Sequence, residues 1–241
     1  KEKFVGSKTA SMDEGLCTSC RRCEEFCRFS AIHVPDQDGA KPTIDIDVCE
    51  GCGVCVRICP EKAVRLVDRT VGEWYLSETD RGTMVHALLE PGAENSGKLV
   101  AMVKHMAKAA AKEQGAELVL VDGPPGIGCP VISALSGADL VVIVSEPTLS
   151  GLSDFKRIAD LARGFHIVCA LLVNKSDLNC DVTDSLLKEA GSRDIECIGN
   201  IPYDEVLIER MAKGVDFADD GTGSAAVDEI SKSYRRLRWL L

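Results

Sequence analysis

Eight of the twelve cysteines follow one spacing, C-x2-C-x2-C-x3-C, which occurs twice within the first 60 residues. The two runs consist of Cys17, Cys20, Cys23 and Cys27, and of Cys49, Cys52, Cys55 and Cys59. This spacing is typical of bacterial proteins that hold two [4Fe-4S] clusters. It therefore predicts a redox cofactor, and it constrains the local fold because the backbone must wrap around each cluster.

The spacing also predicts which cysteines share a cluster. In such runs three successive thiolates face one cluster, and the fourth turns towards the other. We expect the first cluster to be held by Cys17, Cys20, Cys23 and Cys59, and the second by Cys49, Cys52, Cys55 and Cys27. Structural zinc would need only four ligands and would leave half of each run without a use. A disulfide framework would need an oxidising compartment.

Length and charge add further constraints. At 241 residues the chain extends well beyond the cysteine runs, so one small and one medium domain are expected. We expect an iron–sulfur domain at 11–68 and a second domain at 69–241, with residues 1–10 as the leading segment of that second domain. The net charge of −10 argues against a nucleic-acid partner, which would need clustered Lys and Arg. With no long apolar segment in the sequence, we expect a cytoplasmic location and no membrane partner.

Strand-like and helical patterns alternate in the second domain. Continuous apolar runs, typical of parallel strands covered on both faces, occur at 118–121, 140–144 and 167–173. Helical periodicity with capping residues or terminal glycines occurs at 98–114, 153–163, 183–190 and 204–213. This order predicts an α/β fold with a doubly wound, mainly parallel sheet, beside a small α+β iron–sulfur domain. The amphipathic segment 226–241 is expected to pack against the α/β domain.

Polar motifs follow these strands, at the edge where doubly wound sheets bind ligands. Asp122 follows the run 118–121 and precedes Pro-Pro-Gly126, so the acid can serve magnesium and the glycine can sense a γ-phosphate. Two further motifs, which could read a purine base, contain Asn174, Asp177 and Pro202. Each motif alone also fits an ordinary cap or polar turn, so both interpretations stay open for each.

The chain resembles the MinD/ParA/Mrp group of P-loop ATPases in the order and spacing of four motifs: Asp122-Gly-Pro-Pro-Gly126, Ser145-Glu-Pro-Thr148, Asn174-Lys-Ser-Asp177 and Ile201-Pro-Tyr-Asp204. With the cysteine runs, it is similar to MinD-superfamily ATPases that carry an inserted two-cluster ferredoxin domain. The resemblance implies a P-loop NTPase sheet and a homodimer. It also implies a magnesium-serving catalytic Asp122 and an ATP or ADP site that includes Gly126, Asn174, Asp177 and Pro202.

One departure from this pattern concerns the glycine-rich phosphate loop, which in the family precedes the ferredoxin insert. The sequence begins at Lys1 and reaches the cysteine runs at once, so we expect this chain to be a C-terminal portion. The segment Gly92–Leu99 nearly fits G-x-x-x-x-G-K-[ST], but Leu99 replaces the hydroxyl that would bind magnesium. We expect this segment to be an ordinary capped helix start.

These patterns favour an iron–sulfur ATPase in which ATP gates electron transfer or metallocofactor handling, with a redox or metallocofactor-assembly protein as partner. The ATPase activity is expected only when a phosphate loop is supplied. Two alternatives remain. One is a ferredoxin-type electron carrier on a nucleotide-blind scaffold, and the other is a scaffold that assembles and transfers clusters.

Overall fold

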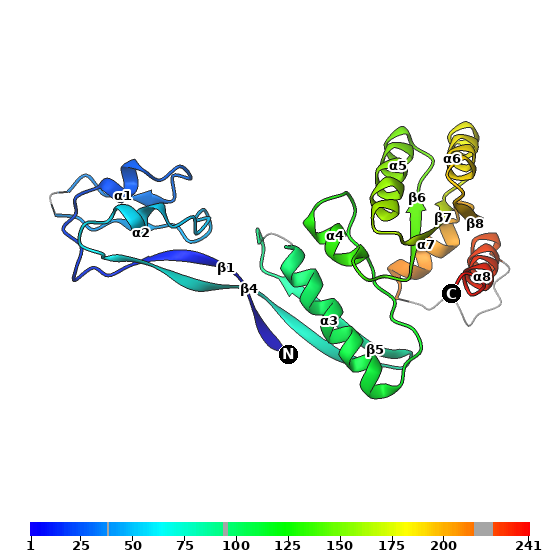
Figure 1. Cartoon of the computed structure of the whole chain (residues 1–241), viewed down its shortest axis with the longest axis horizontal. Coiled ribbons are helices and arrows are strands. Elements are labelled where there is room, and N and C mark those ends of the chain that lie inside the picture. Colours follow the sequence, from blue (N-terminus) through cyan, green and yellow to red (C-terminus); the bar gives the residue numbers. More distant parts are fainter. Residues whose placement is uncertain (38, 94–95, 215–223) are drawn as a thin grey trace. The chain divides into compact units, whose positions relative to one another are not determined.

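The computed structural model describes residues 1–37, 39–93, 96–214 and 224–241, and it divides the chain into two compact units, 1–122 and 123–241. Each unit is built around its own sheet (Figure 1). The domain boundary expected between residues 68 and 69 falls inside a single strand of the first unit. The structure therefore divides the chain at a later position than the one expected from composition.

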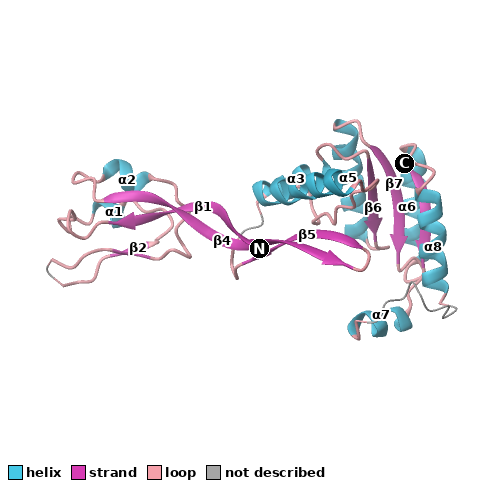
Figure 2. Ribbon diagram, turned by 90° about the horizontal axis from the view of Figure 1, so that it is seen from below, coloured by secondary structure: helices cyan, strands magenta, loops and turns pink. Residues whose placement is uncertain are grey.

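An antiparallel sheet with the order β1-β4-β5 forms the frame of the first unit. Its strands are β1 (Glu2–Met12), β4 (Val64–Thr79) and β5 (Gly82–Leu89). β1 and β4 pair from Glu2 with Trp74 to Met12 with Val64, and β4 pairs with β5 from Gly72 with Leu89 to Thr79 with Gly82. Figure 2 shows these strands as one long ribbon. The sequence analysis did not predict this ribbon, because charged residues interrupt the apolar pattern along β4.

The cysteine runs lie between β1 and β4, in a small subdomain with short elements. These are α1 (Arg22–Glu25), β2 (Ile32–His33), β3 (Thr43–Ile44) and α2 (Val54–Ile58), and β2 pairs with β3. Its buried core consists of Ala10, Cys23, Ile32, Cys55 and Val64. Because two of these residues belong to the cysteine runs, the core of this subdomain is formed around the cysteine sites.

Helix α3 (Gly97–Gln114) packs on the ribbon at the end away from the cysteines. Its Leu99 is buried together with Phe4 of β1 and Val71 of β4. Ser96 caps the helix by accepting a hydrogen bond from the N–H of Leu99, and Gly115 ends it with a left-handed φ of 67°. The predicted helix at 98–114 is confirmed, although it belongs to the first unit.

A parallel sheet with the order β6-β7-β8 forms the centre of the second unit. The elements of this unit are α4 (Cys129–Leu135), β6 (Leu140–Ser145), α5 (Leu149–Gly164), β7 (Val168–Asn174), α6 (Cys180–Ser192), β8 (Glu196–Ile201), α7 (Glu205–Ala212) and α8 (Ala225–Leu237). The alternation of strands and helices confirms the predicted α/β arrangement. Two helices begin earlier than expected, because Thr148 and Asn179 are the residues that cap α5 and α6.

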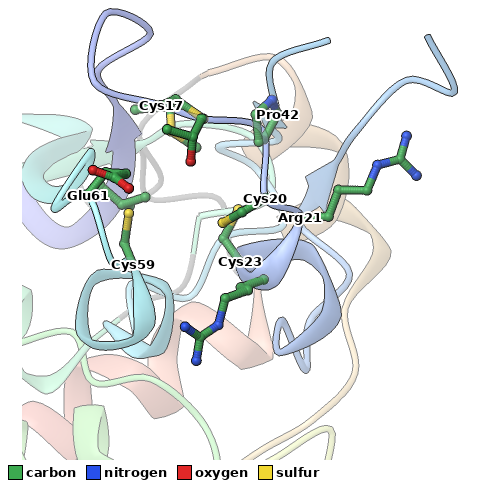
Figure 3. Close-up of a pocket in the computed structure, with 11 residues that line it drawn as sticks. Cys17, Cys20, Arg21, Cys23, Pro42, Cys59 and Glu61 are labelled. Carbon is green, nitrogen blue, oxygen red and sulfur yellow. The ribbon is translucent and has the colours of Figure 1, made fainter. Parts of the chain in front are cut away.

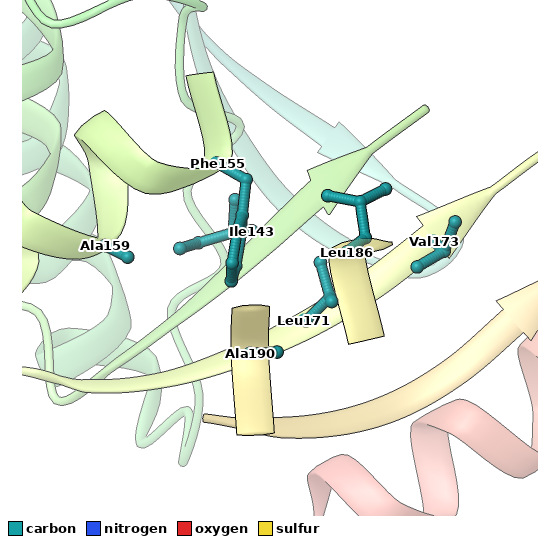
Figure 4. Close-up of a cluster of buried hydrophobic side chains, with 7 residues drawn as sticks. All are labelled: Ile143, Phe155, Ala159, Leu171, Val173, Leu186 and Ala190. Carbon is teal, nitrogen blue, oxygen red and sulfur yellow. The ribbon is translucent and has the colours of Figure 1, made fainter. Parts of the chain in front are cut away.

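Helices pack on both faces of this sheet, although Val144 of β6 is 60% exposed. Figure 4 shows the core between the strands and helices α5 and α6, formed by Ile143, Phe155, Ala159, Leu171, Val173, Leu186 and Ala190. On the opposite face α8 packs so closely on β8 that a Cβ added at Gly199 would lie 1.9 Å from Ser233 Oγ. Arg236 donates a hydrogen bond of 2.8 Å to the carbonyl of Ile198. The expectation that the last segment packs on this domain is confirmed for α8.

Candidate functional site

Two cysteine-lined hollows lie in the small subdomain. We call the first one site I. It is lined by Cys17, Cys20, Cys23 and Cys59, and Figure 3 shows these side chains together with Arg21, Pro42 and Glu61. Three of the four cysteines come from the first run and one from the second, which is the grouping that the sequence predicts.

We call the second hollow site II. The cysteines that line it are Cys49, Cys52, Cys55 and Cys27. Ala10 of β1 and the glycines Gly51 and Gly53 complete its wall. All twelve cysteines are free, so the eight in the two runs are available as thiolate ligands. Four converging thiolates are the donor set that a [4Fe-4S] cluster takes.

Left-handed backbone positions form the turns around each site. Arg21 has φ 58° and Gly53 has φ 76°, and each directly precedes a short helix that carries a buried cysteine, Cys23 or Cys55. Gly51 has φ 60°, and a Cβ there would lie 2.1 Å from the carbonyl oxygen of Lys8. Only glycine lets β1 approach the loop this closely.

Backbone N–H groups donate hydrogen bonds to sulfur atoms in both sites. Ala31 donates to Cys27 Sγ at 3.4 Å and Ala63 donates to Cys59 Sγ at 3.3 Å. The first cysteine of each run also accepts such a bond: Cys17 from Ser19 and Cys49 from Ala10, both at 3.4 Å. These donors favour negatively charged sulfur, which is the form that binds iron.

The cysteines differ in how their surroundings affect the thiol. Burial raises the pKa of Cys23 and Cys55 above the ordinary value. Burial also acts to raise the pKa of Cys49, but the neighbouring Thr9 hydroxyl, hydrogen bonds from nearby N–H groups and the charge of Arg69 lower it overall. Cys49 therefore has the surroundings that best stabilise a thiolate among these three.

The predicted base-binding residues lie together at the carboxyl ends of β7 and β8. Asn174 is in register with Ile201, the residue before Pro202. The carboxylate of Asp177 accepts a hydrogen bond of 2.7 Å from the N–H of Tyr203, and Ser176 N–H donates to the Ile201 carbonyl at 2.9 Å. The structure thus brings Asn174, Asp177 and Pro202 to one edge of the sheet.

The predicted magnesium residue and switch glycine occupy a different kind of position. Asp122 is exposed and is the last residue of the first unit, whereas Gly126, with φ 89°, lies in the second. The prediction of a strand at 118–121 is wrong: these residues form no regular element, and Leu120 is 88% exposed. Among the described residues no strand pairs with this run, and an extended run is stabilised only by such pairing.

The segment that nearly matches a phosphate loop has another role. Lys98 donates a hydrogen bond of 2.9 Å to the carbonyl of Val5 and lies 5.8 Å from the centre of the Phe4 ring. Ser96 caps α3, as described above. Residues 94 and 95 lie outside the described part of the chain. The expectation of a capped helix start is confirmed.

The four remaining cysteines have no place in these sites. Burial raises the pKa of Cys169 and Cys197, which pack against the core of the second unit. Cys129 and Cys180 are exposed at the starts of α4 and α6.

Among described residues, no three His, Cys, Asp or Glu side chains gather as a single-ion site. No described helix has both the length and the apolar character needed to cross a membrane.

The sequence analysis missed the contribution of β1 to site II. Lys8, Thr9 and Ala10 pass beside the second cysteine run, where Ala10 donates to sulfur and Thr9 is 7% exposed. The only sequence signal for this contribution was a short alternating segment before the first cysteine run. Such a segment predicts a strand, but it does not predict which residues the strand will lie beside.

Comparison with known proteins agrees with this geometry. The family described as "4Fe-4S dicluster domain" matches residues 8–64. A MinD cell division protein from Aquifex aeolicus aligns with a TM-score of 0.51 and 22% identity, covering 68% of each chain. The cell division ATPase MinD of Pyrococcus furiosus aligns with a TM-score of 0.53 and 13% identity, covering 70% of each chain. The chain combines a 4Fe-4S dicluster domain with a MinD-like fold.

Curated relatives of this MinD-like chain include two uncharacterized proteins of Methanocaldococcus jannaschii. One is 34% identical over 164 residues, 68% of this chain and 55% of the relative. The other is 28% identical over 187 residues, 77% of this chain and 62% of the relative. This chain thus spans little more than half the length of these relatives. A shorter match, 38% identical over 61 residues, covers 25% of this chain and 22% of one component of an ion-translocating oxidoreductase complex of Methanosarcina acetivorans.

Proposed function

We propose that this protein couples the nucleotide state of its MinD-like fold to electron transfer through two [4Fe-4S] clusters. In this proposal Cys17, Cys20, Cys23 and Cys59 hold one cluster at site I, and Cys49, Cys52, Cys55 and Cys27 hold the other at site II. The clusters supply one-electron chemistry when bound. The match of 61 residues of this chain to a component of an oxidoreductase complex supports a redox protein as the partner.

The observation that carries this proposal is the position of Asp122. The residues proposed to serve magnesium and to sense the γ-phosphate span the junction at which unit 1–122 passes into unit 123–241. The first unit contains both cysteine sites, and the second contains the proposed base-binding edge. A nucleotide that orders Asp122 and Gly126 therefore acts on the covalent connection between the two.

The roles of the remaining residues follow from their chemistry. The Asp122 carboxylate would hold magnesium, and Gly126 would adopt different backbone angles with and without a γ-phosphate because its φ of 89° is accessible mainly to glycine. Asn174, Asp177 and the turn at Pro202 would bind the adenine base of ATP or ADP. We further propose that nucleotide binds in a homodimer, as the family resemblance implies.

The test is ATP hydrolysis by the protein expressed from its complete reading frame under anaerobic conditions. Wild-type protein should hydrolyse ATP, and Asp122→Asn should reduce the rate at least about tenfold because the neutral amide holds magnesium poorly. Asp139→Asn removes a carboxylate just before β6 and serves as the control, which should retain activity. Equal rates for Asp122→Asn and wild type would contradict the proposal.

A second candidate is a ferredoxin-type electron carrier on a nucleotide-blind scaffold. The exposed, unpaired run 118–121 before Asp122 favours it, because Asp122 is then not fixed at the end of a strand. A carrier should keep its clusters in the presence of a chelator and an apo-ferredoxin, whereas a cluster-transfer scaffold should lose them. Absence of any nucleotide binding by the full protein, with stable clusters, would favour the carrier.

A further inference from the structure

The two cysteine sites can be compared residue by residue. Positions 32 apart correspond, as Cys17 does to Cys49 and Cys27 to Cys59. The correspondence extends to hydrogen bonding, since Ala31 and Ala63 donate in the same way to Cys27 and Cys59. A donor that one site has and the other lacks is therefore a real difference between two otherwise similar surroundings.

The first such difference is at Ala10. Its N–H donates to Cys49 Sγ at 3.4 Å in site II. The corresponding residue of site I is Pro42, which lines that hollow and has no N–H group to donate. The sulfur of Cys17 thus lacks the donor that its counterpart Cys49 has.

The second difference is at Thr9, the neighbour of Ala10. Thr9 is 7% exposed, and its Oγ1 has no hydrogen-bond partner among the described residues. The sulfur of Cys49 lies beside this hydroxyl. A buried hydroxyl without an acceptor is costly, so a negatively charged sulfur at this position satisfies it. The counterpart of Thr9 is Lys41, whose ammonium donates to the carbonyl oxygen of Cys17 and not to its sulfur.

Nearby cations do not reproduce this difference. Each site has one cationic side chain close to the first cysteine of a run. Lys41 lies near Cys17 at site I, and Arg69 lies near Cys49 at site II. Arg21 and Arg22 also line site I, but both are exposed to solvent, where their charges are screened. The hydrogen bond from Ala10 and the buried Thr9 hydroxyl beside Cys49 therefore distinguish the two sites.

We propose that Thr9 and Ala10 set the reduction potential of site II above that of site I. Hydrogen bonds to a ligand sulfur stabilise the more negative, reduced state and so raise the potential. Thr9 is in this account a positioning and tuning residue, because its hydroxyl lies beside the ligand sulfur and not beside a reacting partner. The asymmetry makes site II the one that retains an added electron.

The test is a redox titration of the full protein without nucleotide, followed by electron paramagnetic resonance. Thr9→Val keeps the shape of the side chain and removes the hydroxyl. We expect the higher of the two potentials to fall, so that the reduced-to-oxidised ratio at a fixed potential drops about tenfold, or about 59 mV for one electron. The lower potential should not move, and Thr9→Ser, which restores the hydroxyl, should return the higher one towards wild type.

A reciprocal variant tests the same claim at the other site. Pro42→Ala supplies site I with the N–H that it lacks, so the lower potential should rise while the higher stays in place. If Thr9→Val fails to retain iron, Pro42→Ala decides the question. A Thr9→Val protein with both potentials unchanged, or a Pro42→Ala protein with an unchanged lower potential, would overturn the inference. Because nucleotide is absent, these outcomes do not depend on ATP hydrolysis.

Discussion

The carboxylate of Asp177 accepts a hydrogen bond of 2.7 Å from the N–H of Tyr203, and this bond ties the loop after β7 to the loop after β8. Asn174 and Ile201 pair directly beside it. The two loops are therefore held together before any ligand arrives, which reduces the ordering cost of binding a planar base.

Replacing Asp177 separates the structural role of this bond from the proposed recognition of a base. Asp177→Ala removes both and should weaken ATP binding about tenfold or more, since one hydrogen bond and one charged contact are lost. Asp177→Asn keeps an acceptor for the N–H of Tyr203, so its affinity for ATP should lie between those of wild type and Asp177→Ala. Isothermal titration calorimetry with Mg-ATP measures both. Asp184→Ala, on the exposed surface of α6, is the control. Wild-type affinity in Asp177→Ala would refute the assignment of this edge.

The contact between Gly51 and Lys8 predicts a variant specific for site II. A Cβ at Gly51 would lie 2.1 Å from the Lys8 carbonyl oxygen, whereas at Gly53, with a similar φ, the nearest atom is Leu66 Cδ1 at 3.6 Å. Gly53→Ala should cost about 1–2 kcal/mol for the left-handed backbone alone. Gly51→Ala adds a clash with backbone and should cost more, with loss of about half of the bound iron. Iron analysis and anaerobic urea unfolding measure the two effects, and similar losses in both variants would argue against the close approach.

The two cysteine groups were predictable because the motif encodes the ligand geometry itself. Strands β6 and β7 were predictable because apolar runs such as 167–173 are typical of strands buried on both faces. The ribbon β1-β4-β5 was not predictable. The first part of β4 pairs with β1 and the last part pairs with β5, which breaks any simple alternation of apolar and polar residues. The run 118–121 misled the sequence analysis because a strand depends on a neighbour that its own residues do not specify.

An ion-pair network should make the second unit sensitive to acid. Arg193 of the loop after α6 contacts Glu189 at 2.7 Å and Asp160 of α5 at 2.5 Å, and its hydrogen bond holds the pKa of Glu189 below the ordinary value of 4.5. A lowered carboxyl pKa stabilises the fold above pH 4.5, and this contribution is lost as the pH falls through the folded-state value. Arg193→Gln should lower the unfolding free energy by roughly 0.5–1 kcal/mol at pH 7.

The difference between Arg193→Gln and wild type should shrink below pH 4.5. Urea unfolding followed by circular dichroism at several pH values measures it. Arg157→Gln removes a more exposed contact of 3.6 Å to Asp154 and should change little. A difference that stays constant with pH would contradict the role given to Glu189.

Destabilising the core of the second unit should unfold that unit without disrupting the cysteine sites. Leu186 is fully buried, so Leu186→Ala should lower the unfolding free energy of this unit by about 2–5 kcal/mol. Leu187 is only partly buried, so Leu187→Ala should lower the unfolding free energy by less. Because the cysteine sites lie in unit 1–122, the visible absorption of the clusters should persist when Leu186→Ala loses the helical signal of the second unit. Simultaneous loss of both signals would contradict this division.

The most direct test of nucleotide-coupled electron transfer is the rate at which the reduced full-length protein is oxidised by a fixed one-electron acceptor, measured by stopped flow with ATP, with ADP and without nucleotide. We predict at least about a threefold difference between the ATP and nucleotide-free rates, abolished by Asp122→Asn at the junction between the units. Identical rates in all three conditions, with ATP shown to be bound, would contradict the coupling of nucleotide to the clusters.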